Sequence, residues 1–210
     1  MEKTGKQIAE KLLQIKAIKL EPANHFTWAS GWYSPIYCDN RKTLSYPEVR
    51  NFIKNEFLKA IEENFSDIDV IAGVATGAIA QGVLIADALD KAFVYVRPKA
   101  KEHGMGNQIE GTINPGQRVV VIEDLISTGG SSLNAVKALR EANAEVLGMV
   151  AVFSYGFQKA TDNFNKENVK LITLSDYNYL LQQAIDTGYV SQNDLQTLEE
   201  WRKNPGEWKK

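Results

Sequence analysis

The strongest constraint on the fold is one run that joins a strand, an acid pair, a glycine- and hydroxyl-rich loop and a helix. Residues 119–122 are Val-Val-Val-Ile, a continuous β-branched run typical of a strand buried on both faces. Glu123 and Asp124 follow, and a loop that begins at Leu125 leads into a helix predicted over 130–142. This strand-loop-helix unit predicts an α/β protein.

The loop has the chemistry of a phosphate site. Its backbone N–H groups and the N-terminus of the following helix point at one spot, so they bind an anion without a positive side chain. Gly129 and Gly130 allow the backbone to approach closely. The hydroxyl donors are Ser127, Thr128, Ser131 and Ser132. A Walker loop and a dinucleotide fingerprint are excluded, because their glycine and lysine spacings are missing.

The acid pair suits the sugar of the same ligand. Two ionised carboxylates hold a phosphate poorly, but they accept hydrogen bonds from neighbouring hydroxyls such as O2 and O3 of a ribose. Solvated acids beside an ordinary turn are the alternative, yet a turn or a helix cap does not need acids, hydroxyls and two glycines together. The run therefore predicts a ribose 5-phosphate site.

Composition narrows the class of protein. The 210 residues are 44% hydrophobic, which suits one domain with a sizeable core. A net charge of −2 and a pI of about 5.8 argue against a surface for nucleic acid or an anionic membrane. With Cys38 the single cysteine, and with no signal peptide or long apolar stretch, we expect a cytoplasmic protein.

The rest of the chain alternates strands and helices. We predict a helix over 4–16, an aromatic hairpin or small subdomain over 26–40 and a long helix from Pro47. The predicted strands of the sheet are 69–74, 92–97, 118–124, 145–153 and 169–175. The other predicted helices are 78–89, 157–167, 177–186 and 192–203.

Residues 97–111 form a polar segment that is rich in cations and lacks apolar periodicity. Its four potential cations are Arg97, Lys99, Lys101 and His103. An isolated Lys-x-Lys is usually a solvated surface. If the bound sugar is transferred from a ribosyl diphosphate, pyrophosphate leaves with several negative charges, and cations placed on it stabilise the transition state. In an acidic chain with a phosphosugar loop, we therefore interpret the segment as a mobile catalytic lid.

The strand-to-loop run resembles the phosphoribosyl-diphosphate signature of type I phosphoribosyltransferases. With the lid and the stretch Phe26–Arg41, which contains Ser30-Gly31 and Ser34-Pro35, the resemblance narrows to the orotate phosphoribosyltransferase family. It implies transfer of ribose 5-phosphate from 5-phosphoribosyl 1-diphosphate to orotate, which gives orotidine 5′-monophosphate and pyrophosphate in pyrimidine biosynthesis.

The resemblance also implies a fold and an assembly. The fold is a single α/β domain, with a mostly parallel twisted sheet flanked by helices over about 46–175 and a small hood from about 1–45 and 176–210. The protein is expected to be a homodimer, in which the lid of one chain completes the site of its partner. Mg²⁺ is expected as cofactor, bound mainly through the substrate.

The candidate site residues fall into four groups. Lys101, His103 and Asp124 are the catalytic candidates. The ribosyl diphosphate is assigned to Arg97, Lys99, Lys101, His103, Glu123, Asp124, Leu125, Ile126, Ser127, Thr128, Gly129, Gly130 and Ser131. Orotate is assigned to Tyr37, Cys38, Ser127 and Tyr155, and pyrophosphate to the loop Ala75, Thr76 and Gly77.

Three other classes of protein share a ribose-phosphate loop. The Phe26–Arg41 stretch argues against a purine phosphoribosyltransferase, the lack of a basic face against a ribosyl-diphosphate-sensing regulator, and the chain length against a ribosyl-diphosphate synthetase. Within that stretch, Asp39 and Arg41 fit either substrate contact or a local ion pair. A surface position or local packing is the favoured interpretation for His25, and packing or an interface for Trp201 and Trp208.

Overall fold

The computed structural model describes residues 2–28, 30–99 and 108–209. Within these residues a six-stranded sheet has the order β10-β9-β8-β5-β6-β7, and all neighbours are parallel except the antiparallel pair β6 and β7. The strands are β5 (Val70–Val74), β6 (Ala92–Val96), β7 (Ile109–Glu110), β8 (Arg118–Ile126), β9 (Glu145–Ser154) and β10 (Leu171–Asp176). The predicted α/β class with a mostly parallel sheet is confirmed.

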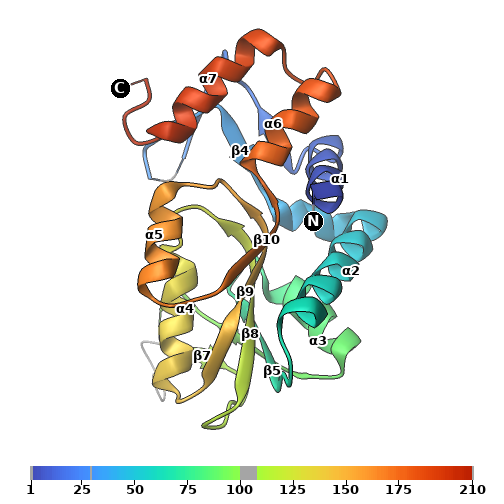
Figure 1. Ribbon diagram of the computed structural model, residues 1–210, viewed down its shortest axis with the longest axis vertical. Helices are drawn as coiled ribbons and strands as arrows, with labels where there is room; N and C mark the ends of the chain where they lie inside the picture. The colour runs from blue at the N-terminus through green and yellow to red at the C-terminus, as the bar shows by residue number, and fades with distance from the viewer. Residues whose placement is uncertain (1, 29, 100–107, 210) are drawn as a thin grey trace.

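Helices cover both faces of the sheet (Figure 1). One face carries α4 (Gly130–Glu141) and α5 (Gln158–Lys166), and the other α1 (Glu2–Gln14), α2 (Pro47–Asn64) and α3 (Ile79–Leu89). Alternate residues of β8 serve the two faces, since Val119 and Val121 pack toward α4 and α5 whereas Val120 and Ile122 pack toward α1 to α3. The β-branched run is therefore buried on both faces, as its composition predicts.

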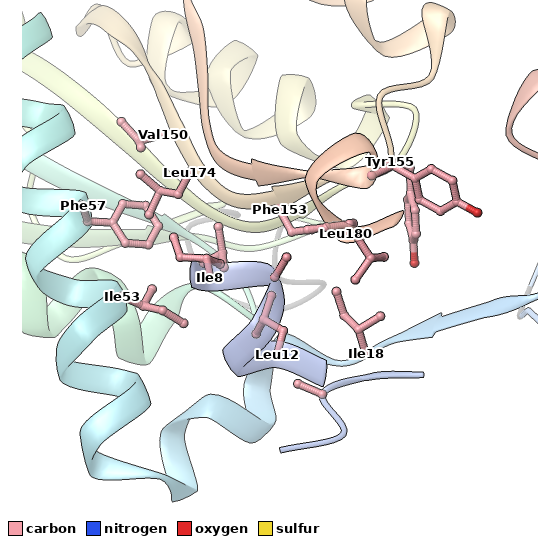
Figure 2. Packing of buried hydrophobic residues seen from close by; sticks show 14 of the residues in the cluster. Ile8, Leu12, Ile18, Ile53, Phe57, Val150, Phe153, Tyr155, Leu174 and Leu180 are labelled. Carbon is pink, nitrogen blue, oxygen red and sulfur yellow. The ribbon is translucent and has the colours of Figure 1, made fainter. Parts of the chain in front are cut away.

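The larger hydrophobic cluster joins the N-terminal helix to the sheet. Figure 2 shows Ile8 of α1 beside Phe57 of α2 and Leu174 of β10, with Leu12 further along α1 on the side of Phe153. Because α1 carries its apolar residues on one face, this contact fixes the first helix against the domain core.

The remaining elements lie beyond one end of the sheet, and we call them the hood; α1, which falls within the bounds expected for the hood, packs against the sheet instead (Figure 1). They are the antiparallel pair β1 (Ile18–Leu20) and β4 (Ile36–Cys38), the hairpin β2 (Phe26–Thr27) and β3 (Tyr33–Ser34), the 3₁₀ helix η1 (Asn40–Ser45), α6 (Tyr177–Asp186) and α7 (Gln192–Lys203). Segments from the two ends of the chain thus meet in one layer.

The structure extends the sequence prediction in three places. β8 continues two residues beyond the predicted end, because Leu125 and Ile126 pair with the last residues of β9. The short strand β7 lies in the segment predicted as a polar loop, and β1 was not predicted. No helix among the described residues is long and apolar enough to cross a membrane.

Candidate active site

The candidate site lies at the carboxyl ends of β5 and β8, where the connections from two neighbouring strands leave the sheet on opposite faces. β5 and β8 are neighbouring parallel strands, and the loop after β5 leads to α3 on one face whereas the loop after β8 leads to α4 on the other. Ligands of open α/β sheets bind in the crevice that such a divergence leaves at the carboxyl ends of the strands. The two predicted phosphate loops, 75–77 and 125–131, both occupy this place.

Gly129 begins the phosphate end of the site. It has a left-handed conformation, with φ of 79°, and a Cβ there would lie 2.7 Å from the ring of Phe164. Both constraints require glycine. Asn163 of α5 donates to the Thr128 carbonyl at 2.9 Å, while Gly130 and Ser131 remain exposed. The loop is thus held from behind and open in front, where the first N–H groups of α4 can meet an anion.

Glu123 is buried, with 4% of its surface exposed, and both of its oxygens accept hydrogen bonds. Ser132 Oγ donates to Oε2 at 2.7 Å, and the Asp124 amide donates to Oε1 at 2.9 Å. Burial, followed by repulsion from the neighbouring Asp124 carboxylate, raises the pKa of Glu123 to about 8. The carboxyl group is therefore mainly protonated at neutral pH, and it fixes the start of α4 to the end of β8.

Asp124 is half-buried and joins the two loops. Its carboxylate lies against Gly77, where an added Cβ would come within 2.3 Å of Oδ2. The Ala75 amide donates to the Val96 carbonyl at 2.9 Å, and the peptide bond between Ala75 and Thr76 is cis. Glycine at position 77 therefore leaves room for the Asp124 carboxylate in its observed orientation, a contact that the sequence alone did not reveal.

The base of the lid lies beside both loops. Arg97 and Gln108 are joined by two hydrogen bonds, from the Arg97 amide at 2.9 Å and from Gln108 Nε2 at 2.8 Å. Asn134 of α4 donates to the Pro98 carbonyl at 3.2 Å. Arg97 also forms an ion pair with Glu110, at 3.6 Å. These contacts join the two described ends of the predicted lid to each other, and the contact of Asn134 with Pro98 links its first end to α4.

The candidates of the lid and the loop have different surroundings. Lys99 is exposed, whereas Lys101 and His103 lie outside the described residues. Ile126 directs its side chain into one hydrophobic cluster, and the partly buried Leu125 packs against the other. Ser127 is half-buried at the start of the loop.

The predicted base-binding residues approach from the hood. Tyr37 is 39% exposed, with its ring 5.7 Å from that of Phe26. Desolvation, with the nearby charges of Asp124 and Asp39, raises the pKa of the Cys38 thiol well above its ordinary value, so the thiol is neutral. Tyr155 is only 2% exposed, and its ring packs against those of Trp28 and Phe157.

Sequence reasoning missed Asn40, which lies between the hood and the acid pair. Its Nδ2 donates to the Asp124 carbonyl at 2.6 Å. A single asparagine belongs to no recognisable sequence motif. Its only signal is its position between Asp39 and Arg41, within the stretch Phe26–Arg41 that the sequence relates to the base site. Those two residues form the local ion pair, at 2.6 Å, which lowers the pKa of Asp39 through the hydrogen bond from Arg41.

The other aromatic candidates pack locally. His25 is exposed and its ring lies 4.3 Å from that of Tyr33, in agreement with the expected surface position or local packing. Trp201 is fully buried, and its indole donates to the Tyr33 carbonyl at 3.2 Å. Trp208 packs edge-on at 6.3 Å from His25.

The N-terminus of α4, the acid pair and a second backbone loop thus lie together at the carboxyl ends of β5 and β8, an arrangement suited to a phosphorylated sugar. Residues 45–183 match the family model of the phosphoribosyl transferase domain. The chain is 58% identical to the orotate phosphoribosyltransferase of Porphyromonas gingivalis, over 99% of both chains, and 58% identical to that of Bacteroides thetaiotaomicron, over 99% of this chain and 98% of that one.

Solved structures agree with these relatives. The orotate phosphoribosyltransferase of Aeropyrum pernix superposes with a TM-score of 0.76 at 26% identity, covering 88% of this chain and 99% of that chain. The chain belongs to the phosphoribosyltransferase family, in its orotate phosphoribosyltransferase branch.

Proposed function

We propose that this protein transfers ribose 5-phosphate from 5-phosphoribosyl 1-diphosphate to orotate, giving orotidine 5′-monophosphate and pyrophosphate in pyrimidine biosynthesis. The observation that carries the proposal is the position of Asp124, between the phosphate loop 127–131 and the pyrophosphate loop 75–77. A ribose held there has its 5-phosphate on one loop and its diphosphate on the other. High identity to relatives named for this activity supports the same reaction.

Each part of the site has a proposed task. The backbone of 127–131 and the hydroxyls of Ser127, Thr128 and Ser131 bind the 5-phosphate. Asp124 accepts hydrogen bonds from the ribose hydroxyls, and Glu123 supports it and joins it in binding when the ligand is present. The backbone of Ala75, Thr76 and Gly77 receives the diphosphate. Orotate is assigned to Ser127, Tyr37, Cys38 and Tyr155, of which Tyr155 is buried.

The reaction is a displacement at the anomeric carbon. A bond forms from a ring nitrogen of orotate to this carbon, the bond from the carbon to the diphosphate oxygen breaks, and the proton of the nitrogen passes to the departing pyrophosphate or to water. Positive charge develops on the ribose while pyrophosphate leaves with the negative charge. We assign the neutralisation of that charge to Arg97, Lys99, Lys101 and His103 of the lid, so positioning and electrostatics are the main sources of rate.

Mg²⁺ is proposed as cofactor, held mainly by oxygens of the ribosyl diphosphate. Among the described residues there is no group of three or more His, Cys, Asp or Glu side chains that could hold a metal ion. A hard cation such as Mg²⁺ binds through substrate phosphate oxygens and one or two carboxylates, and Asp124 is a carboxylate beside the proposed diphosphate loop. When bound, the ion neutralises charge on the departing diphosphate.

We propose a homodimer in the cytoplasm, with the lid crossing to the partner's site. The outer face of α3, directly after the pyrophosphate loop, is apolar: Val83 is 45% exposed, and Ile79, Ala80 and Leu84 are only half-buried. A second copy of the chain would cover this face and bring its own lid near the crevice.

A mixing experiment tests the exchange of lids. Lys101→Ala and Asp124→Asn are each expected to be nearly inactive, but co-refolded mixtures should regain about a quarter of the wild-type rate. Half of the dimers are then mixed, and one of their two sites carries neither lesion. If the lid served its own chain, every site would keep one lesion and no activity would return.

The activity itself is tested by pyrophosphate release from 5-phosphoribosyl 1-diphosphate and Mg²⁺ with orotate, uracil, adenine or hypoxanthine. Release with orotate, and at most slow release with the others, is expected. Absence of release with orotate would overturn the proposed reaction. Removal of Mg²⁺ by a chelator should stop turnover, and its return should restore it.

A further inference from the structure

Asn40 is the polar residue through which the hood reaches the ribose site. It is the first residue of η1, and only 3% of its surface is exposed. Its Nδ2 donates to the Asp124 carbonyl at 2.6 Å, a contact between residues 84 positions apart in sequence. Its Oδ1 accepts from Cys38 Sγ at 3.3 Å, and its own carbonyl accepts from Thr43 Oγ1 at 2.6 Å.

Asp124 needs such a partner because β8 has lost one neighbour at this point. The pairing of β8 with β5 ends at Ile122, which lies opposite Gly73. Beyond it, the Asp124 carboxylate rests against Gly77, while Asn40 holds the Asp124 main chain. A carboxylate is aimed by its backbone as much as by its rotamer, so a shift of the carbonyl moves the group that accepts the ribose hydroxyls.

We propose that Asn40 is a positioning residue, whose hydrogen bond to the Asp124 carbonyl sets the place where the ribose is held and joins it to the base side of the site. The inference rests on the proposed function, because Asp124 is taken as the ribose-binding carboxylate. Cys38 of β4 is the link on the hood side, since its thiol donates to the same amide that holds Asp124. The base segment and the ribose segment are thus coupled through one side chain.

Two variants remove the donor in different ways. Asn40→Asp keeps the shape and the acceptor for Cys38 but places a carboxylate oxygen against the Asp124 carbonyl, and Asn40→Ala removes the amide. Both are expected to lower kcat/KM for 5-phosphoribosyl 1-diphosphate by roughly tenfold to a hundredfold, with an increase in its Kd. Thr43→Val is the matched control, because it removes a hydrogen bond of η1 that does not reach Asp124.

The control separates positioning from general stability. Thr43→Val should lower the thermal midpoint about as much as Asn40→Ala while leaving kcat/KM within about twofold of wild type. In an Asp124→Asn background, Asn40→Ala should add little further loss, since both changes act through one group. Folded Asn40 variants with wild-type Kd and kcat/KM, or losses that multiply in the double variant, would overturn the inference.

The role of Asn40 can be tested separately from the proposed reaction. Titration calorimetry with 5-phosphoribosyl 1-diphosphate and Mg²⁺ needs no orotate, so it measures the ribose site alone. If wild-type protein binds this ligand but does not use orotate, the proposed reaction fails and the comparison of Asn40 with Thr43 still stands. If Asn40→Ala does not fold, the isosteric Asn40→Asp variant decides.

Discussion

The phosphate end of the site and the hood are built in opposite ways. At the phosphate end, residues 119–132 form strand, acid pair, loop and helix as one continuous piece of chain, and Glu123 meets Ser132 only nine positions later. In the hood, Trp201 donates to the Tyr33 carbonyl across 168 positions. The residue spacing within a local unit specifies that unit. A site assembled from both chain ends depends on contacts between distant side chains, which leave no pattern in the sequence.

The largest expected effect on stability comes from the Trp201 indole, on which the packing of the hood depends. The ring of Trp201 lies within 5.7 Å of those of Trp28, Tyr155, Phe157 and Tyr177. Trp201→Ala should lower the free energy of unfolding by about 3–5 kcal/mol, measured by urea denaturation. The KM for orotate should rise more than that for the ribosyl diphosphate, because the hood covers the base side.

Trp201→Phe and Trp208→Ala are the controls. Phenylalanine keeps ring packing and loses the bond to the Tyr33 carbonyl, so we expect a loss of about 1–2 kcal/mol. Trp208 is only partly buried, and its removal should have a smaller effect. Equal losses for Trp201→Ala and Trp208→Ala would show that the hood has no central residue.

At the phosphate end, function and stability should separate. Gly77→Ala places a Cβ against the Asp124 carboxylate, which can turn away at little cost to folding. We expect kcat/KM for the ribosyl diphosphate to fall by roughly tenfold to a hundredfold, with less than about 1 kcal/mol lost in unfolding free energy. In an Asp124→Ala background the same change should have no further effect on kcat/KM. A further loss there would mean that Gly77 acts independently of the acid pair.

The smallest expected effect concerns the protonation of Glu123. Because its pKa is about 8 in the folded protein, against 4.5 as its ordinary value, the folded state binds the proton more tightly. Its contribution to stability therefore falls as pH rises from about 4.5 to about 8. Glu123→Gln removes this titration and keeps partners for the Asp124 amide and Ser132. The unfolding free energy of the variant minus that of the wild type should therefore be larger at pH 9 than at pH 5, by ~1–3 kcal/mol.

Urea denaturation at pH 5, 7 and 9 measures the difference. The pH dependence should be flatter in the variant than in the wild type over this interval. A parallel pH dependence in both proteins would contradict the raised pKa. Ser132→Ala, which removes a donor that lowers this pKa, should make the fall of stability with pH steeper.

Features built from local sequence were predictable, whereas features built from contacts between distant segments were not. The sheet, its helices and the loop after β8 were predictable, because period-two and helical patterns and the glycine-hydroxyl run are all local. β1 was not, since its three residues gain their partner only when β4 folds back on them. The reason for Gly77 was equally hidden, because it is the carboxylate of Asp124 that fills the space of a side chain.

The sequence by itself determined the α/β class, the strand-loop-helix unit and the residues from Glu123 to Ser131, because backbone geometry and hydrogen-bonding capacity are set by neighbouring residues. Tertiary structure alone decided which carboxyl group is buried and protonated, which glycine admits Asp124, and that Asn40 holds the end of β8. These properties arise from burial and from contacts between distant segments. They exist only once the sheet has brought the ends of β5 and β8 together beneath the hood.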